Sequence, residues 1–597
     1  MKNNHIFILS IGPVQTFIAQ ARKAQDLFGG SRLLSHLCTE AIDFSKEKGV
    51  QVIFPVINKQ KSIPNRFVGT INGSQEELRK LGEAIEQHIQ DTFLKIAQKI
   101  KNEYKIGNVI NFDEQIKQHL EIHWIFYPIE TNYETDYAEA EKWFGAAKNI
   151  RQFQQLPESG RKCSLDGERN VKVYRLKDNE DRKKVLKRKL FQEEDEVHII
   201  QNNSKIPLSL LSEGEGLSAV SFVKRDFDTL NFPSTAKIAL MDTLNSIWKN
   251  GDDGIKLLVD YMNEFIKTTN FDEQLLFDEN VSIDYFKYHG YLSLMQNIVQ
   301  IRKRYEDLVK YMNKNNLPLQ KYYALMVFDG DRMGQIISGK NLKTTSKHKL
   351  RDFQKRTSEL LAEYAEWAYK YLDNPKGQTI YAGGDDFMGF INLNYLYEAM
   401  QELYDQFNCK VNKILKTEFA EDLDDGFNFT FSAGVVITHY KTPLSIVLKK
   451  AREMEKLAKK DEHKGGGGRD AFAISVIKHS GESHATVYKW SYLSNIKGIN
   501  DQLQSESYSN TFIKNIQNEL NAFGTMNTFD FVKDGHTGAA IAENEIKRLV
   551  ERSRMPNQPK GTMQTDIIDI FHSTEEFDNF SQALNIAQFT KRQSIAK

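Results

Sequence analysis

Two short acidic segments are the parts of this chain best suited to chemistry. Asp329-Gly-Asp331 follows the apolar run 322–328, and Gly383-Gly-Asp-Asp386 lies between two short β-rich runs. Converging carboxylates repel one another, and Mg²⁺ is commonly held by one or two carboxylates together with substrate phosphates. Two such ions about 4 Å apart can activate an attacking hydroxyl and stabilise a leaving pyrophosphate. The segments therefore predict a metal site that acts on phosphates, although Asp/Gly-rich turns are also ordinary turn chemistry.

Two glycines and one lysine could complete such a site. Gly383 and Gly384 would let the backbone approach a phosphate where a Cβ would clash. Lys459, in the last turn of a helix expected over 443–460, would direct a cation toward the acidic segments. A triphosphate needs such a counter-charge. Basic residues are also common at helix ends, so a local role for Lys459 stays open.

The elements around the acidic segments must bring them together. Their predicted order is β-α-β-β-α-β with one further strand. The expected strands are 322–328, 378–382, 387–391, 429–438 and 471–477, and the expected helices are 347–372, 395–415 and 443–460. In such a ferredoxin-like sheet the first strand lies beside the hairpin, so carboxylates 56 residues apart in the sequence can converge.

The start of the chain has a similar pattern. Strands are expected at 5–11, 50–56, 66–71 and 121–127, and helical segments at 14–44 and 74–100. Gly29-Gly-Ser31 is expected to interrupt the first helical segment. Two copies of one plan predict a pseudo-dimer of related domains. The predicted fold class is multidomain α+β, with ferredoxin-like domains over 1–135 and 321–485, a mostly helical part over 136–320 and a helical C-terminal domain over 486–597.

Composition narrows the class of protein. The 597 residues include 80 basic and 80 acidic side chains, so no global field attracts nucleic acid. The run 160–190 carries twelve Lys/Arg against five Asp/Glu, which is either a solvated face or a local phosphate-backbone contact. No run approaches the roughly 18 apolar residues of a membrane helix. Three scattered cysteines exclude a disulfide framework and favour a cytoplasmic protein.

Other candidate sites are weaker. Cys163-Ser-Leu-Asp166 resembles one Cys-x-x-Cys pair of a zinc knuckle in which aspartate stands in place of the second cysteine. Because the pair has only one thiolate, we do not expect it to bind structural zinc tightly. His119 and His123 are expected to be a structural pair. No phosphate-binding Gly-x-x-x-x-Gly-Lys-Ser/Thr loop occurs, and no His-Asp dipeptide indicates a metal-dependent phosphohydrolase.

Taken in order, these motifs resemble one family, the large polymerase/cyclase-like subunits of type III-B (Cmr-type) CRISPR–Cas effector complexes. The resemblance covers most of the chain and rests on the order of several short segments. They are Ser10-Ile-Gly-Pro-Val-Gln-Thr-Phe-Ile18, Ala21-Arg-Lys23, Asp26-Leu27, Pro64-Asn-Arg-Phe67, Gly160–Arg169, Phe232-Pro-Ser-Thr235, Asp329-Gly-Asp-Arg-Met-Gly334, Gly383-Gly-Asp-Asp386, Ser432-Ala-Gly434 and Gly468-Arg-Asp-Ala471.

The resemblance implies two palm domains, similar to adenylyl cyclase, that face each other with ATP between them. It implies that Asp329, Asp385 and Asp386 are catalytic and hold Mg²⁺ or Mn²⁺, with Asp331 as a helper ligand. The residues that it places nearest the nucleotide are Gly383, Gly384, Ser432 and Lys459, with Gly12, Pro13 and Ser31 beside a second nucleotide.

The family's activity is the condensation of ATP into signalling cyclic oligoadenylates after a crRNA-guided complex binds target RNA. The implied partners are therefore other Cmr subunits, crRNA, target RNA and ATP, and no membrane. Some relatives attach AMP to S-adenosylmethionine instead, and the sequence does not choose the acceptor. A non-catalytic scaffold and a free-standing cyclase that makes a dinucleotide are the other readings.

Two departures from the family matter. Many relatives begin with a His-Asp nuclease domain, whereas here the palm pattern begins at residue 5. We therefore expect no DNase activity. The incomplete knuckle at Asp166 puts the family's zinc site in doubt.

Overall fold

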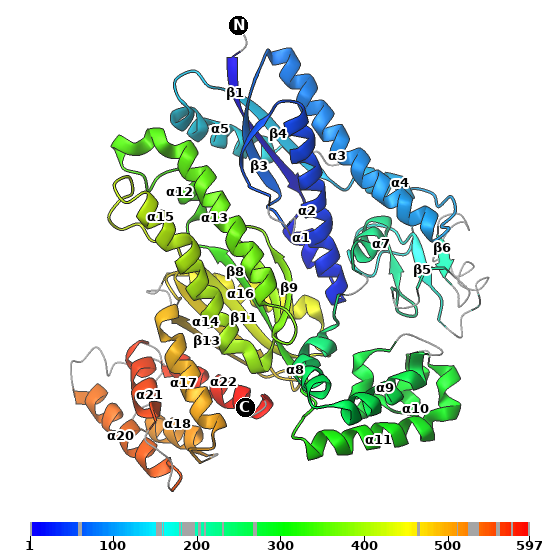
Figure 1. The fold of residues 1–597 in the computed structure, drawn as a ribbon, viewed down its shortest axis with the longest axis vertical. Helices are drawn as coiled ribbons and strands as arrows, with labels where there is room; N and C mark the ends of the chain where they lie inside the picture. Colours follow the sequence, from blue (N-terminus) through cyan, green and yellow to red (C-terminus); the bar gives the residue numbers. More distant parts are fainter. Residues whose placement is uncertain are drawn as a thin grey trace.

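Four successive parts make up the fold, from the blue N-terminal sheet to the orange and red C-terminal helices in Figure 1. The computed structural model describes residues 3–57, 62–150, 158, 160–177, 181, 197–200, 205–207, 210–229, 232–266, 271–289, 291–461, 466–509, 511–522, 537–556, 561–574 and 577–594. Strands and helices alternate in both sheet domains, which confirms the α+β class. In these residues no helix is both long and apolar enough to cross a membrane.

The first palm is a four-stranded antiparallel sheet in the order β2-β3-β1-β4, and the predicted β-α-β-β-α-β order is confirmed. Its strands are β1 (Asn3–Gly12), β2 (Gln51–Phe54), β3 (Arg66–Gly73) and β4 (Glu121–Pro128). Its helices are α1 (Gln15–Ala19), α2 (Ala24–Glu47), α3 (Gln75–Glu103), α4 (Phe112–Lys117) and α5 (Tyr133–Lys148). Because α5 packs on β4 and β1, the predicted boundary at 135 is too early.

The middle part contains two separate units, whereas one mostly helical part was predicted. The first, in the residues that the structure describes, is a small sheet packed with α7 (Ala219–Asp226); its strands are β5 (Val173–Arg175), β6 (His198–Ile200) and β7 (Gly216–Leu217). The second is helical and has its own apolar core: α8 (Thr235–Lys249), α9 (Asp252–Ile266), α10 (Ile283–Tyr288) and α11 (Ile298–Lys314). Of the basic run 160–190, residues 178–180 and 182–190 lie outside the described residues.

Helix α2 runs without a break, so the predicted interruption at Gly29-Gly-Ser31 is wrong. The glycines allow α7 to pack closely instead. A Cβ on Gly29 would lie 2.0 Å from the main-chain oxygen of Lys224, and one on Gly30 would lie 2.8 Å from the Cε of the same lysine. Glycine in a helix costs about 1 kcal/mol relative to alanine, and here the close contact offsets that cost.

The second palm is a six-stranded sheet in the order β13-β12-β11-β8-β10-β9. Its strands are β8 (Tyr322–Gly330), β9 (Gly377–Ala382), β10 (Asp386–Asn392), β11 (Phe431–His439), β12 (Ala471–Ile477) and β13 (Ser483–Lys489). Its helices are α12 (Met333–Ile337), α13 (Leu350–Tyr371), α14 (Leu396–Phe407), α15 (Lys413–Glu418) and α16 (Leu444–Lys459). The predicted boundary at 485 falls inside β13, which is an additional strand that the sequence did not reveal.

Strand β8 is buried on both faces, which explains its continuous apolar sequence. Ala324, Met326 and Phe328 belong to the core that contains α13 and α14, and the intervening side chains belong to the core that contains α16. Packing on both faces fixes the register of β8 and therefore the position of the acidic segment at its end.

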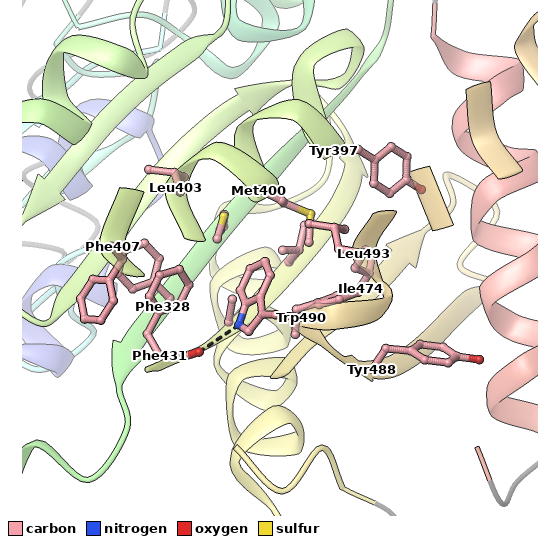
Figure 2. Close-up of a cluster of buried hydrophobic side chains, with 14 of the residues drawn as sticks. Phe328, Tyr397, Met400, Leu403, Phe407, Phe431, Ile474, Tyr488, Trp490 and Leu493 are labelled. Carbon is pink, nitrogen blue, oxygen red and sulfur yellow. Dashed lines mark hydrogen bonds between the residues drawn. The ribbon is translucent and has the colours of Figure 1, made fainter. Parts of the chain in front are cut away.

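The C-terminal helices share a core with the second palm. They are α17 (Leu493–Gln504), α18 (Phe512–Ala522), α20 (Thr537–Ser553), α21 (Met563–His572) and α22 (Phe577–Gln593). Figure 2 shows Trp490 at this junction, where its Nε1 donates a 2.9 Å hydrogen bond to the carbonyl of Phe431. The same indole stacks on Tyr404. The helical C-terminal domain is therefore an extension of the palm core.

Candidate active site between the two palms

The three predicted catalytic aspartates converge at one edge of the second sheet. Asp329, at the end of β8, is the direct cross-strand partner of Asp386 at the start of β10. The hairpin turn is tied to β8 because the amide of Gly330 donates to the carbonyl of Asp385 at 2.9 Å. The convergence expected from a ferredoxin-like sheet is confirmed.

Lys459 supplies the cation of the cluster, as predicted. Its Nζ donates to the carboxylate of Asp329 and lies 3.5 Å from a carboxylate oxygen of Glu455, one turn earlier on α16. The glycine-rich segment that follows caps this helix: the amides of Gly467 and Gly468 donate to the carbonyls of Leu457 and Lys460 at 3.0 and 2.7 Å. The cap fixes where α16 ends and thus where Lys459 lies.

Burial and mutual repulsion disfavour the ionised aspartates. Burial, together with the charges of Asp386 and Asp329, raises the pKa of Asp385 to about 8. Burial and the charge of Asp329 raise the pKa of Asp386 to about 6, although a hydrogen bond from Tyr381 favours the ionised form and lowers this pKa. The pKa of Asp329 is also raised by burial, although Lys459 opposes the shift. The cluster is electrostatically strained when all three groups are ionised.

A hard divalent cation fits this donor set, because it would relieve that repulsion and prefers carboxylate oxygens. In the described part of the chain, no three acidic, histidine or cysteine side chains are already grouped around one point. We therefore expect one or two of these aspartates to hold each ion, with substrate phosphates completing the coordination.

The raised pKa values predict that metal binding depends on pH. Because ions displace protons from Asp385 and Asp386, the apparent Mn²⁺ affinity should rise about tenfold per pH unit for each proton displaced, up to about pH 8. Isothermal titration near pH 7 in buffers of different ionisation enthalpy should show proton release. The pKa values of both carboxyl groups in the folded chain exceed the usual aspartate value, so the folded chain holds these protons more tightly than the unfolded chain. The free energy of unfolding without metal should therefore fall as pH rises from about 4 to about 8. An affinity independent of pH would contradict this expectation.

Asp331 lies beside the cluster, and its carboxylate is already occupied. One oxygen accepts 2.8 Å from the Ser432 hydroxyl, and the other accepts 2.8 Å from the Thr430 hydroxyl and 3.0 Å from the amide of Asp470. Asp331 and Ser432 are both buried. This arrangement ties β11 and the start of β12 to the end of β8, which favours a positioning role for Asp331 over the predicted helper-ligand role.

Asparagine at position 331 separates these two roles. The asparagine oxygen can accept from Thr430 and the amide of Asp470, and its nitrogen can donate to the Ser432 hydroxyl, which then accepts instead of donating. Asp331→Asn should therefore retain nucleotide turnover within a few-fold, whereas Asp331→Ala should lose most of it. A metal-ligand role would make Asp331→Asn as inactive as Asp329→Asn. Turnover with Mn²⁺, compared across these three variants, decides between the roles.

A cavity of about 500 Å³ lies between the two palms next to the hairpin turn, a size usual for small-molecule sites. Gly383, Gly384 and Asp385 line it from the second palm. Its other lining residues are Phe54, Pro55, Val56, Ser62, Pro64, Arg66, Tyr137 and Glu141 from the first palm and Met333, Gly334, Ile337, Ser338, Lys340, Ser358, Leu361 and Ala362 from the second. A mostly apolar chamber that opens onto an acidic turn can hold a nucleoside with its phosphates at the turn.

The palms also contact each other directly around this cavity. The Ser62 hydroxyl accepts a 3.2 Å hydrogen bond from the amide of Ala382, and the Ser358 hydroxyl accepts one of 2.8 Å from the amide of Val56. These contacts hold the first palm against β9 and α13 of the second. The expectation of two palms that face each other across a shared site agrees with this geometry.

Of the predicted site residues, only Gly383, Gly384 and Asp385 line the cavity. Gly12, Pro13 and Ser31, which lie at the end of β1, just after it and within α2, are not among its lining residues. Their predicted contact with a second nucleotide stays a prediction.

Sequence reasoning missed two residues beside the cluster. Tyr381 donates a 2.9 Å hydrogen bond to Asp386, and the charge of Arg452 also opposes the rise in the pKa of Asp386. Arg452 precedes Lys459 by seven residues, two helical turns, so a search for polar side chains on one face of α16 would have found it.

Comparisons with known proteins match both sheets. The family model described as "Cas10/Cmr2, second palm domain" matches residues 322–473, and "CRISPR-associated protein Cmr2, N-terminal" matches residues 6–98. A curated relative, "CRISPR system Cmr subunit Cmr2" of Pyrococcus furiosus, is 23% identical over 585 aligned residues. The alignment covers 82% of this chain but only 63% of the relative.

Solved structures agree on the fold. The chain is similar to a subunit in "Type III-B Cmr-beta Cryo-EM structure of the Apo state", with a TM-score of 0.63, and in "Cryo-EM structure of the Type III-B Cmr-beta bound to cognate target RNA", with a TM-score of 0.66. Each match covers 99% of this chain, 82% and 83% of the other chains, at 12% identity. Residues 6–98 and 322–473 thus match models of Cas10/Cmr2 domains, and the solved structures show that the chain shares the fold of the matched Cmr-beta subunits.

Proposed function

We propose that this protein is the target-RNA-activated nucleotidyltransferase of a type III CRISPR effector complex, which uses ATP and divalent metal to make a signalling nucleotide, cyclic oligoadenylate, in antiviral defence. One observation carries the proposal: Asp329, Asp385 and Asp386 converge beside Lys459, and Asp385 lines a nucleotide-sized cavity between the two palms. Three carboxyl groups whose ionisation is disfavoured by burial and by one another would not stabilise a purely structural turn.

The reaction would join the α-phosphate of one ATP to a hydroxyl of another nucleotide, with release of pyrophosphate. Bound Mg²⁺ or Mn²⁺ would be held by Asp329, Asp385 and Asp386 and would supply activation of the hydroxyl and charge neutralisation at the phosphates. Lys459 would exchange its contact with Asp329 for the triphosphate. The turn at Gly383 and Gly384 would let phosphate approach the backbone, since Gly384 has a φ of +125° that other residues rarely adopt.

Activation by RNA requires a complex. The relatives are named as a Cmr subunit and as Cmr-beta complexes, one of them bound to cognate target RNA. We infer that this chain likewise assembles with other Cmr subunits and crRNA, and that target RNA changes how the two palms meet. The direct contacts of Ser62 and Ser358 across the cavity are where such a change would reach the site.

The test is a product assay on the purified complex with α-labelled ATP and Mn²⁺, read by mass spectrometry, with and without matching target RNA. Oligoadenylates that form only with target RNA are the expected result. The Asp385→Asn, Asp386→Asn complex is the control for contaminating activity. Product from the isolated chain on GTP would instead indicate a free-standing cyclase.

A parallel arm contains S-adenosylmethionine. An AMP conjugate that forms only in that arm would replace oligoadenylate as the product while leaving the roles of the aspartates unchanged, because attack on the α-phosphate needs the same ligands. No nucleotide product in any arm would overturn the proposal and favour a scaffold function.

A further inference from the structure

Four buried side chains in the small sheet unit form a closed hydrogen-bonded cluster. They come as two pairs with the same spacing, Cys163-x-x-Asp166 and Ser218-x-x-Ser221. The Asp166 carboxylate accepts from the Ser218 and Ser221 hydroxyls at 2.7 and 3.0 Å, and the Cys163 thiol donates to the Ser221 hydroxyl at 3.5 Å. Each of the four side chains is almost completely buried.

The spacing of the two pairs is that of the ligands in a four-ligand zinc site. Two x-x-spaced pairs that converge from a loop and a helix start are the usual source of the four ligands. With Zn–S near 2.3 Å, ligand sulfurs in a tetrahedral site lie about 3.8 Å apart, whereas the hydrogen-bonded side-chain atoms here lie closer, at 2.7, 3.0 and 3.5 Å. Of the four positions, however, only Cys163 carries a thiol.

The donors that are present do not fit zinc. The second oxygen of Asp166 accepts from the amides of Glu168 and Arg169 at 2.9 and 3.0 Å, so both oxygens already have two donors each. Hydroxyls are poor zinc ligands compared with thiolate, imidazole and carboxylate. Burial alone would raise the pKa of Asp166, but its hydrogen bonds hold that pKa below the usual value, so the carboxylate is ionised without a metal.

We propose that this cluster replaces a structural zinc: the Asp166 carboxylate holds the start of α7 through hydrogen bonds, so the unit folds without metal. The carboxylate, at the second position of the first pair, accepts from both serines of the second pair, so hydrogen bonds link positions that a zinc ion would otherwise join. Ser218 is also the N-cap of α7, where its hydroxyl accepts from the amide of Ser221 at 3.2 Å. A negative charge at this end of a helix is stabilising.

The cluster matters for the rest of the protein because α7 holds the first palm. Lys224, one turn after Ser221, donates to the carbonyls of Phe17 and Gln20 at the end of α1. The next residue, Arg225, pairs with Asp26 on α2. The end of α1 and the first turn of α2 are therefore anchored to a helix whose start is bound by Asp166.

The first test measures metal and local stability in the full-length chain. We expect less than 0.1 zinc per chain by mass spectrometry, and no change in the thermal midpoint with a zinc chelator. Asp166→Ala should increase hydrogen exchange in residues 15–47 at least tenfold, whereas Glu168→Ala, at an exposed neighbour in the same loop, should not. One tightly bound zinc per native chain, or unchanged exchange in Asp166→Ala, would overturn the proposal.

The second test rebuilds the metal site. The triple variant Asp166→Cys, Ser218→Cys, Ser221→Cys should bind one Zn²⁺ per chain, and Co²⁺ should give the absorption of a tetrahedral thiolate site. Its thermal midpoint should then become sensitive to the chelator. The matched control, Asp166→Cys alone, offers two thiols and should bind neither ion tightly. Failure of a folded triple variant to bind either ion would refute the inferred ligand geometry, and if that variant does not fold, the first test still decides.

Discussion

Replacing Asp385 and Asp386 together by asparagine is expected to reduce nucleotidyl transfer by the assembled complex at least about 1,000-fold, roughly 4 kcal/mol of transition-state stabilisation. Neutral amides cannot compensate the charge of a divalent cation, so the phosphates would be left with Lys459 alone. The size and shape of the side chains are unchanged, and the hairpin that carries them should form as before.

The control for this loss is Asp352→Asn, which removes an exposed carboxylate from α13 of the same domain and should leave turnover unchanged. Thermal unfolding provides a second readout. Because burial and mutual repulsion raise the pKa of both carboxyls, the double variant should melt higher than the native chain without metal and should no longer respond to Mn²⁺. Turnover at the native level would exclude catalysis at this cluster.

The largest expected effect on stability is that of Arg225→Met. The guanidinium is fully buried and donates to Asp26 at 2.6 Å, to Glu215 at 2.9 Å and to the carbonyl of Leu210 at 2.8 Å. Burial alone would raise the pKa of Asp26, but the charge of Arg225 holds it below its usual value. Methionine would leave two buried carboxylates without their cation, a cost of about 3–5 kcal/mol.

Hydrogen exchange is the measurement, because a protein of several domains does not unfold in two states. Amides of α2 should lose about two to four orders of magnitude of protection. Arg32→Met is a matched control: it removes the pair with Asp228 between the same two segments, but the carboxylate is 54% exposed and the pair should contribute under about 1 kcal/mol. Equal effects of the two substitutions would contradict a special role for the buried network.

The site itself was predictable because it follows from local signals. A buried β-rich run that ends in Asp329 and a hairpin around Gly383-Gly-Asp-Asp386 define neighbouring strands, and the ferredoxin-like order places their ends together. Lys459 was predictable from the same plan. The alternation of strands and helices in the first palm was equally clear.

Long-range packing decided what was not predictable. Gly29 and Gly30 look like a helix break until α7, about 195 residues later, is known to contact them. The cavity depends on how Ser62 and Ser358 join two palms, which no periodicity reveals. Asp331 resembles Asp329 in sequence, yet a tertiary contact with Thr430 and Ser432 gives it a different environment.

The anchoring of α2 by α7 also has a consequence for synthesis on the ribosome. The first palm is complete in sequence at Lys148, but the partner of Asp26 is residue 225. At about 5–20 residues per second, the ribosome needs about 4–15 s to add the intervening residues. During that interval a nascent palm carries the Asp26 carboxylate without the guanidinium of Arg225, which donates to it in the folded chain. The N-terminal sheet therefore completes its packing co-translationally only after α7 leaves the exit tunnel.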